Sequence, residues 1–149
     1  MSIGAGTLPA MESAQLDRVL AADYVGDVTA LAMEDLRAKR AECQALEVAL
    51  SYQRRMAQGR LDIVAAERRR RAEGGDPPSH DDLIRNLARL MEASDADLEH
   101  LVEGISAYEH EVSARRRQLH ERIDALQAEL TRRYRTGEAT VDALLRDAN

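Results

Sequence analysis

Apolar residues recur at helical spacing along most of this chain, and two stretches of that pattern are long and contain no proline. The first stretch begins between Thr29 and Met33 and continues to about Glu73. The second begins at Ser94 and continues to about Tyr134 or beyond. The pattern therefore predicts an all-α fold built on two long helices.

The segments outside these stretches are short. An amphipathic helix is predicted over about residues 10–23, and the run 74–78, with two glycines and two prolines, ends the first long helix. Apolar residues at helical spacing over 80–92 predict a short connecting helix. We expect a long antiparallel two-helix coiled-coil hairpin with a short N-terminal helix. The parts are an N-terminal tail and short helix (1–28), a first long helix (29–73), a hairpin connection (74–93) and a second long helix with the C-terminal end (94–149).

Polar residues of the two long helices form a repeat. Glu, Ser, Arg and Asp recur at the same spacing, 62 residues apart, with a Gln in the first copy where the second has a His. The copies are Glu47, Ser51, Arg54, Gln58 and Asp62, and Glu109, Ser113, Arg116, His120 and Asp124. At about 100° per residue, the five positions fall within an arc of roughly 80°. Each copy therefore forms a polar stripe along one face of its helix.

The apolar residues beside each stripe repeat at the same offset. They are Leu46, Leu50, Ala57, Leu61 and Val64 in the first copy, and Tyr108, Val112, Leu119, Ile123 and Leu126 in the second. Each long helix thus has a packing seam along the edge of its polar stripe. The duplication is therefore structural as well as chemical.

A hairpin in which the stripes face each other has a definite register. Glu47 then lies opposite Asp124, and Asp62 lies opposite Glu109. The same register places Ser94, the first residue of a capping-box sequence, beside the end of the first long helix. Two independent features of the sequence therefore agree on this pairing.

This register gathers like charges. Arg54 lies near Arg116 at the centre, and carboxylates face carboxylates at both ends, so the clusters repel one another without a ligand. A suitable ligand is two-fold symmetric, anionic toward the arginines and rich in N–H donors toward the acids. Guanine offers N1–H and an amino group to a carboxylate, and O6 and N7 to an arginine. A symmetric guanine dinucleotide meets these requirements.

Composition limits the alternatives. The 149 residues include no Phe or Trp and 32% of them are charged, which favours long helices over a thick globular core. The formal net charge of −6 argues against general nucleic-acid binding, so we expect no direct contact with DNA. Cys43 is the single cysteine, which fits a reducing cytoplasm. The chain has neither a signal-peptide pattern nor a membrane-spanning stretch, and we expect a soluble cytoplasmic protein.

Catalysis and metal binding are not expected. His100, His110 and His120 are evenly spaced, but a ten-residue step rotates each by about −80°, so they do not share a helix face. The sequence contains no arrangement of nucleophile and base and no glycine-rich phosphate loop. We therefore predict no enzyme and no metal site.

The motif at Glu47, Ser51, Arg54, Gln58 and Asp62 resembles the cyclic di-GMP signature of the RsiG-type anti-sigma factors of actinobacteria. The resemblance covers roughly residues 30–145 and includes the layout of paired long helices with one motif each. It implies a monomeric antiparallel coiled coil that binds a cyclic di-GMP dimer and, when loaded, sequesters the sporulation sigma factor WhiG.

The family's site residues carry over to both copies of the motif in this chain. In the second copy they fall on Glu109, Ser113, Arg116 and Asp124, whereas His120 departs from the family's Gln. Imidazole can replace the amide in one hydrogen bond, so the second copy is expected to bind more weakly or to be sensitive to pH.

Two questions remain open at this level. The first long helix has a second apolar stripe, which either receives the N-terminal helix of the same chain or docks a sigma factor. This stripe consists of Val48, Tyr52, Met56, Gly59 and Ile63. The alternative to a ligand-gated anti-sigma factor is a structural coiled-coil adaptor or oligomerisation module, whose charged stripes only set the register.

Overall fold

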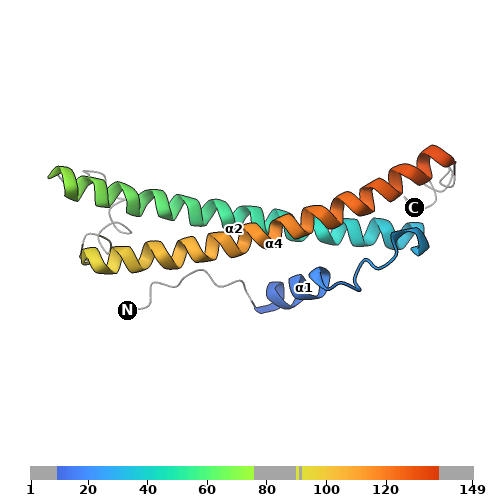
Figure 1. The fold of residues 1–149 in the computed structure, drawn as a ribbon, viewed down its shortest axis with the longest axis horizontal. Helices are drawn as coiled ribbons and strands as arrows, with labels where there is room; N and C mark the ends of the chain where they lie inside the picture. The colour runs from blue at the N-terminus through green and yellow to red at the C-terminus, as the bar shows by residue number, and fades with distance from the viewer. Residues whose placement is uncertain (1–9, 76–89, 91, 138–149) are drawn as a thin grey trace. The chain divides into compact units, whose positions relative to one another are not determined.

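The computed structural model describes residues 10–75, 90 and 92–137, and these residues form helices and no strand (Figure 1). The elements are α1 (Ala10–Leu20), the 3₁₀ turn η1 (Val28–Ala30), α2 (Met33–Glu73) and α4 (Asp95–Thr136). The two long helices, α2 and α4, pack against each other, so the predicted all-α fold is confirmed. The connecting helix predicted over 80–92 falls almost entirely outside the described residues.

The chain divides into two compact units, and each contains part of α2 beside part of α4. The described residues of unit 1 lie within Tyr52–Ser113, and those of unit 2 lie within Leu8–Ser51 and Ala114–Asn149. In unit 2, Arg37 on α2 bonds to Tyr134 near the end of α4. In unit 1, Arg71 at the end of α2 bonds to Asp95 at the start of α4. The long helices therefore run in opposite directions within each unit.

The core of both units is a narrow apolar seam. Its residues recur every seventh position on each long helix, and every one is at most 6% exposed. They are Leu36, Cys43, Leu50, Ala57 and Val64 on α2, and Leu98, Ile105, Val112, Leu119 and Leu126 on α4. A seven-residue repeat keeps the same side of a helix against its partner along its whole length. Each seam residue of α2 has its counterpart on α4 62 residues later, so the duplication extends through the core.

The start of α4 has the predicted capping box. The backbone N–H of Asp97 donates to the Ser94 hydroxyl, and the backbone N–H of Ser94 donates to the Asp97 carboxylate, both at 3.1 Å. These bonds satisfy N–H groups that a helix start otherwise leaves without partners. Hydrogen bonds from Ser94 lower the pKa of Asp97.

In unit 1, the end of α2 carries a buried carboxylate held by two arginines. Glu67 is 3% exposed and accepts hydrogen bonds at 2.8 Å from Arg70 and from Arg71. Arg71 also donates to the carbonyl oxygens of Leu90, at 3.0 Å, and Ala93, at 2.9 Å. The bonds from Arg70 and Arg71 lower the pKa of Glu67 to about 2. This clamp fixes the end of one long helix to the residues that precede the other.

In unit 2, the same clamp recurs 62 residues later. Glu129 accepts hydrogen bonds from Arg132, at 2.8 Å, and Arg133, at 2.7 Å, which lower its pKa to about 2. Arg133 also donates to the carbonyl oxygens of Val28, at 3.3 Å, and Thr29, at 3.1 Å, just before α2 begins. Each unit therefore has one long helix clamped to the segment that leads into the other.

Helix α1 packs within unit 2. Its Leu16 and Val19 are fully buried, and Glu42 on α2 accepts a hydrogen bond from Gln15 at 3.0 Å. At the other end of α1, the Arg122 guanidinium on α4 donates to the carbonyl oxygen of Leu20. The N-terminal helix thus lies over one face of the α2–α4 pair.

The second apolar stripe of α2 is not the face that α1 covers. Val48 is 65% exposed, Tyr52 59%, Met56 44% and Ile63 39%. The alternative in which the N-terminal helix packs on this stripe is therefore wrong, because α1 is held by Glu42 and the α4 arginines instead.

Replacing Glu67 by Gln tests the clamp. We expect the free energy of unfolding near pH 7 to fall by about 1–3 kcal/mol, because the hydrogen bonds from Arg70 and Arg71 lose the charge of the buried carboxylate. The measurement is urea unfolding followed by circular dichroism, with Glu121→Gln on the exposed surface of α4 as the control.

The same variant has a pH signature. The pKa of Glu67 is about 2 in the folded protein against an ordinary value of 4.5, so its stabilising effect is complete above pH 4.5 and is lost as the pH falls toward 2. Wild type should lose stability over this range more steeply than Glu67→Gln. Equal slopes would contradict the clamp.

Candidate ligand-binding site

The ten motif residues are divided between the units in complementary sets. Unit 1 contains Arg54, Gln58 and Asp62 of α2 with Glu109 and Ser113 of α4, and we call this set half-site 1. Unit 2 contains Glu47 and Ser51 of α2 with Arg116, His120 and Asp124 of α4, and we call this set half-site 2. Each half-site thus has one full set of side-chain types, drawn from both copies of the motif. The register drawn from the sequence had likewise placed Glu47 with Asp124, and Asp62 with Glu109.

In half-site 2, the polar residues converge on one carboxylate oxygen. The Ser51 hydroxyl donates to Oε1 of Glu47 at 2.6 Å, and Nε of Arg116 donates to the same oxygen at 2.8 Å. Arg116 Nε also lies 2.7 Å from the Ser51 hydroxyl oxygen, and Nε2 of His120 lies 3.3 Å from Oε1 of Glu47. The hydrogen bond from Ser51 and the bond and charge of Arg116 lower the pKa of Glu47. In this structure the Glu47 carboxylate of half-site 2 is therefore already hydrogen-bonded to the arginine of the same half-site.

In half-site 1, the corresponding bond between the helices is not formed. The Ser113 hydroxyl donates to Glu109 at 2.8 Å, as Ser51 does to Glu47. However, Nε of Arg54 is buried and has no hydrogen-bond partner in the described part of the chain. Gln58 and Asp62 are exposed. Half-site 1 therefore has the same side-chain types as half-site 2 except for Gln58 in place of His120, but its arginine still has a hydrogen bond to donate.

The predicted repulsion at Glu47 is wrong. The register drawn from the sequence placed Glu47 against Asp124, but its carboxylate contacts Arg116 and His120, and Asp124 is exposed. The physical reason is that the Glu47 side chain is only 18% exposed, and a carboxylate so close to the apolar seam requires a positive partner. The long arginine side chain reaches it from a neighbouring turn of α4.

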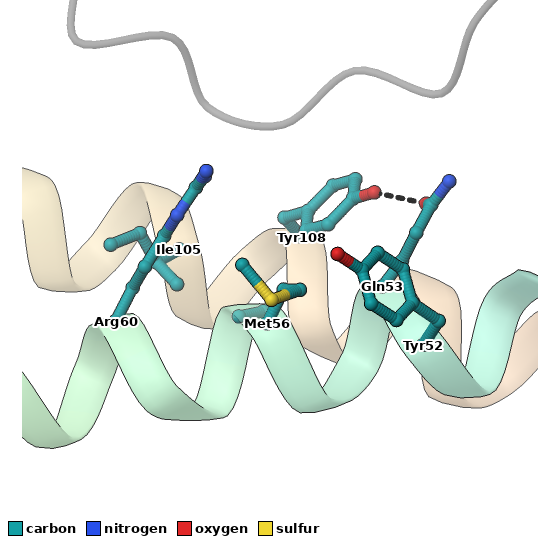
Figure 2. A pocket seen from close by; sticks show the side chains of 7 residues that line it. Tyr52, Gln53, Met56, Arg60, Ile105 and Tyr108 are labelled. Atoms are coloured by element: carbon teal, nitrogen blue, oxygen red, sulfur yellow. Dashed lines mark hydrogen bonds between the residues drawn. The ribbon is translucent and has the colours of Figure 1, made fainter.

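Unit 1 also contains a shallow pocket that sequence analysis missed. Figure 2 shows this pocket, whose volume is about 260 Å³ and which none of the ten motif residues lines. Its lining consists of Tyr52, Gln53, Met56, Ala57, Arg60, Ile105 and Tyr108. The Tyr108 hydroxyl donates to the side-chain oxygen of Gln53 across the two helices. The exposed stripe of α2 was the signal that pointed toward this region.

Within the described ranges, no group of three or more His, Cys, Asp or Glu side chains is placed to hold a metal ion. Among the same residues, none of the helices combines the length and apolar character needed to cross a bilayer.

Comparison with protein families gives two matches to one model. The model described as RsiG-like matches residues 22–89 and again residues 84–148. The second match begins 62 residues after the first, which is the spacing of the repeat, and each match includes one copy of the polar motif. No curated protein and no solved structure matches the chain.

The unequal half-sites predict unequal effects of two equivalent substitutions. Glu47→Gln should lower the free energy of unfolding by about 1 kcal/mol, because it weakens a partly exposed bond between the helices. Glu109→Gln, at the equivalent position, should have less than half that effect, since Glu109 accepts its hydrogen bond from Ser113 of its own helix. Chemical unfolding of both variants without ligand provides the measurement. Equal losses would mean that Arg116 does not hold Glu47 in solution.

Proposed function

The chain belongs to the RsiG-like family, which indicates an anti-sigma factor, and from this premise we propose that its two long helices bind a cyclic di-GMP dimer. When loaded, the protein sequesters a WhiG-like sporulation sigma factor in the cytoplasm. The observation that supports this most directly is the pair of composite half-sites, each with a carboxylate, a hydroxyl, an arginine and an amide or imidazole.

The chemistry of each half-site suits guanine. A carboxylate such as Glu47 accepts hydrogen bonds from N1–H and the exocyclic amino group of the base. An arginine such as Arg116 donates to O6 and N7, stacks on the base plane, or neutralises a phosphate. The hydroxyl of Ser51, already 2.6 Å from Glu47, keeps the carboxylate oriented for this contact. Guanine thus offers partners to both the glutamate and the arginine of a half-site, which a molecule lacking N–H donors does not.

The presence of two half-sites in one chain supports a ligand with two equivalent parts. A dimer of cyclic di-GMP offers one copy to each half-site, so one chain is sufficient for one ligand dimer. The protein then remains a monomer in its complex with the sigma factor. The ligand acts as a regulator and the protein carries out no catalysis.

Ligand binding changes the hydrogen bonds of the two half-sites in different ways. In half-site 2, the hydrogen bond between Arg116 and Glu47 must break first. The N–H groups of the ligand then donate to Glu47, and Arg116 donates to acceptors of the ligand. In half-site 1, Arg54 gains a hydrogen-bond acceptor without giving one up. Half-site 1 therefore binds first and more tightly, and half-site 2 follows.

The sigma factor responds through linkage. If it prefers the loaded protein, cyclic di-GMP binds the sigma complex more tightly than the free protein, and by the same factor. A structural coiled-coil adaptor, the alternative function, has no such dependence on nucleotide. The two functions are therefore separated by whether the ligand changes sigma binding.

Calorimetric titration tests the ligand. Wild type should bind two cyclic di-GMP molecules per chain, and Arg54→Ala should weaken binding by about tenfold or more, because a charge-assisted hydrogen bond is lost. Asp62→Ala should weaken it as well. Arg69→Ala, an exposed arginine of the same helix outside the motif, is the control. Absence of heat with wild type, both alone and with the sigma factor, would eliminate the proposed function.

Exchanging His and Gln at the equivalent positions tests the order in which the two half-sites bind the ligand. His120→Gln should tighten the second binding step by about two- to fivefold, because the imidazole nitrogen that lies 3.3 Å from Oε1 of Glu47 is removed. Gln58→His, the same exchange in the other half-site, should not tighten either step. Identical two-step titrations for wild type and both variants would show that His120 does not distinguish the half-sites.

A further inference from the structure

The repeat creates two equivalent faces, one in each unit. In unit 2 this face is covered by α1, whose C-terminal carbonyl oxygens at Leu20 and Ala21 accept hydrogen bonds from Arg122. Arg115, one heptad before Arg122, lies 3.5 Å from the carboxylate of Asp17 on α1. The surface on which α1 packs in unit 2, which we call its seat, therefore includes Arg115 and Arg122 of α4.

The equivalent face in unit 1 is the pocket of Figure 2. The counterparts of Arg115 and Arg122, 62 residues earlier, are Gln53 and Arg60, and both line the pocket. The other counterparts in the lining are Ala57 for Leu119, Ile105 for Cys43 and Tyr108 for Leu46. Gln53 and Arg60 therefore repeat the two α4 positions that contact α1 and its C-terminal end, and the other three repeat buried apolar positions of unit 2.

The unit 1 seat is more apolar than the unit 2 seat. Glu42, which binds α1 in unit 2, has Gly104 as its counterpart. The two remaining lining residues, Tyr52 and Met56, are 59% and 44% exposed, and their counterparts on α4 are Ala114 and Gln118. Exposed apolar side chains at the edge of a pocket mark a surface for a partner.

The charge of Arg60 determines which end of a helix can bind at its side of the unit 1 pocket. Arg122, its counterpart, donates to the last carbonyl oxygens of α1, which lack partners inside the helix and carry the negative end of its dipole. Arg60 is an exposed cation at the equivalent place in the unit 1 pocket. Charge complementarity thus favours the C-terminal end of an incoming helix at Arg60, with apolar side chains over Met56 and Tyr52.

We propose that this pocket docks an amphipathic helix of the sigma factor, seated on unit 1 in the way that α1 is seated on unit 2. This inference rests on the proposed function, and it adds the surface and the binding mode. The α1 helix of a second copy is a poorer occupant, because its Leu16 and Val19 are already fully buried in its own unit 2.

Paired substitutions test the docking surface. With cyclic di-GMP present, Met56→Glu should weaken binding of the WhiG-like sigma factor by at least tenfold, and Arg60→Gln by about threefold. Gln118→Glu places the same charge at the repeat-equivalent position of α4 and should change sigma binding by less than twofold. Binding of cyclic di-GMP to each variant without sigma is measured in parallel and should match wild type.

The outcomes separate the inference from the proposed function. Sigma binding by Met56→Glu and Arg60→Gln equal to that of wild type overturns the docking surface, while the ligand-gated function stands. If wild type binds no sigma factor, with or without the ligand, the proposed function itself fails.

Crosslinking identifies the occupant. Met56→Cys carries an exposed thiol for a photoreactive label, since the native Cys43 is fully buried, and Gln118→Cys is the matched control. A crosslink from Met56→Cys to a helical peptide of the sigma factor supports the proposal. A crosslink to a second copy, or only to another segment of the same chain, overturns it.

Discussion

The structure depends on a narrow apolar seam. Every seventh residue over most of each long helix is fully or almost fully buried, and four of the five positions three beyond these on α2 are polar: Lys39, Gln53, Arg60 and Glu67, with Leu46 the apolar exception. Such a seam holds two long helices together but leaves no broad hydrophobic interior. Polar side chains therefore lie against it, where each requires a hydrogen bond or an opposite charge. The candidate half-sites and the carboxylate clamps are both consequences of this constraint.

Duplication has given the two units the same chemistry but not the same contacts. The clamps at Glu67 and Glu129 agree closely, because in each a buried carboxylate is held by the arginines three and four residues later on its own helix. The half-sites differ, because their arginines must reach across to another helix. Arg116 makes that bond in unit 2, whereas Nε of Arg54 has no partner in the described part of unit 1. Contacts within one helix are thus fixed by spacing, and contacts between helices depend on local packing.

This distinction explains how much of the structure could be predicted from sequence. Helix class, the long elements and the capping box at Ser94 depend on local spacing, and each was found that way. The pairing of Glu47 was predicted wrongly, because a rigid register ignores how far an arginine side chain reaches. The unequal contacts of the two half-sites were missed, because they depend on how each arginine packs between the helices. The position of α1 was left open, because both faces of α2 offered apolar residues.

Comparison of the two copies of the repeat distinguishes two kinds of position. Where the copies agree, as at the seam, the clamps and most of the motif, both units need the same physical property. Where they differ, the requirement belongs to one unit alone: Tyr52 and Met56 face solvent in unit 1, while Ala114 and Gln118 stand at the same positions in unit 2. Exposed apolar residues stabilise neither a helix in water nor this seam, so their presence in one copy indicates a contact that the other copy does not make. In a duplicated chain, differences of this kind locate binding surfaces that similarity to other proteins does not reveal.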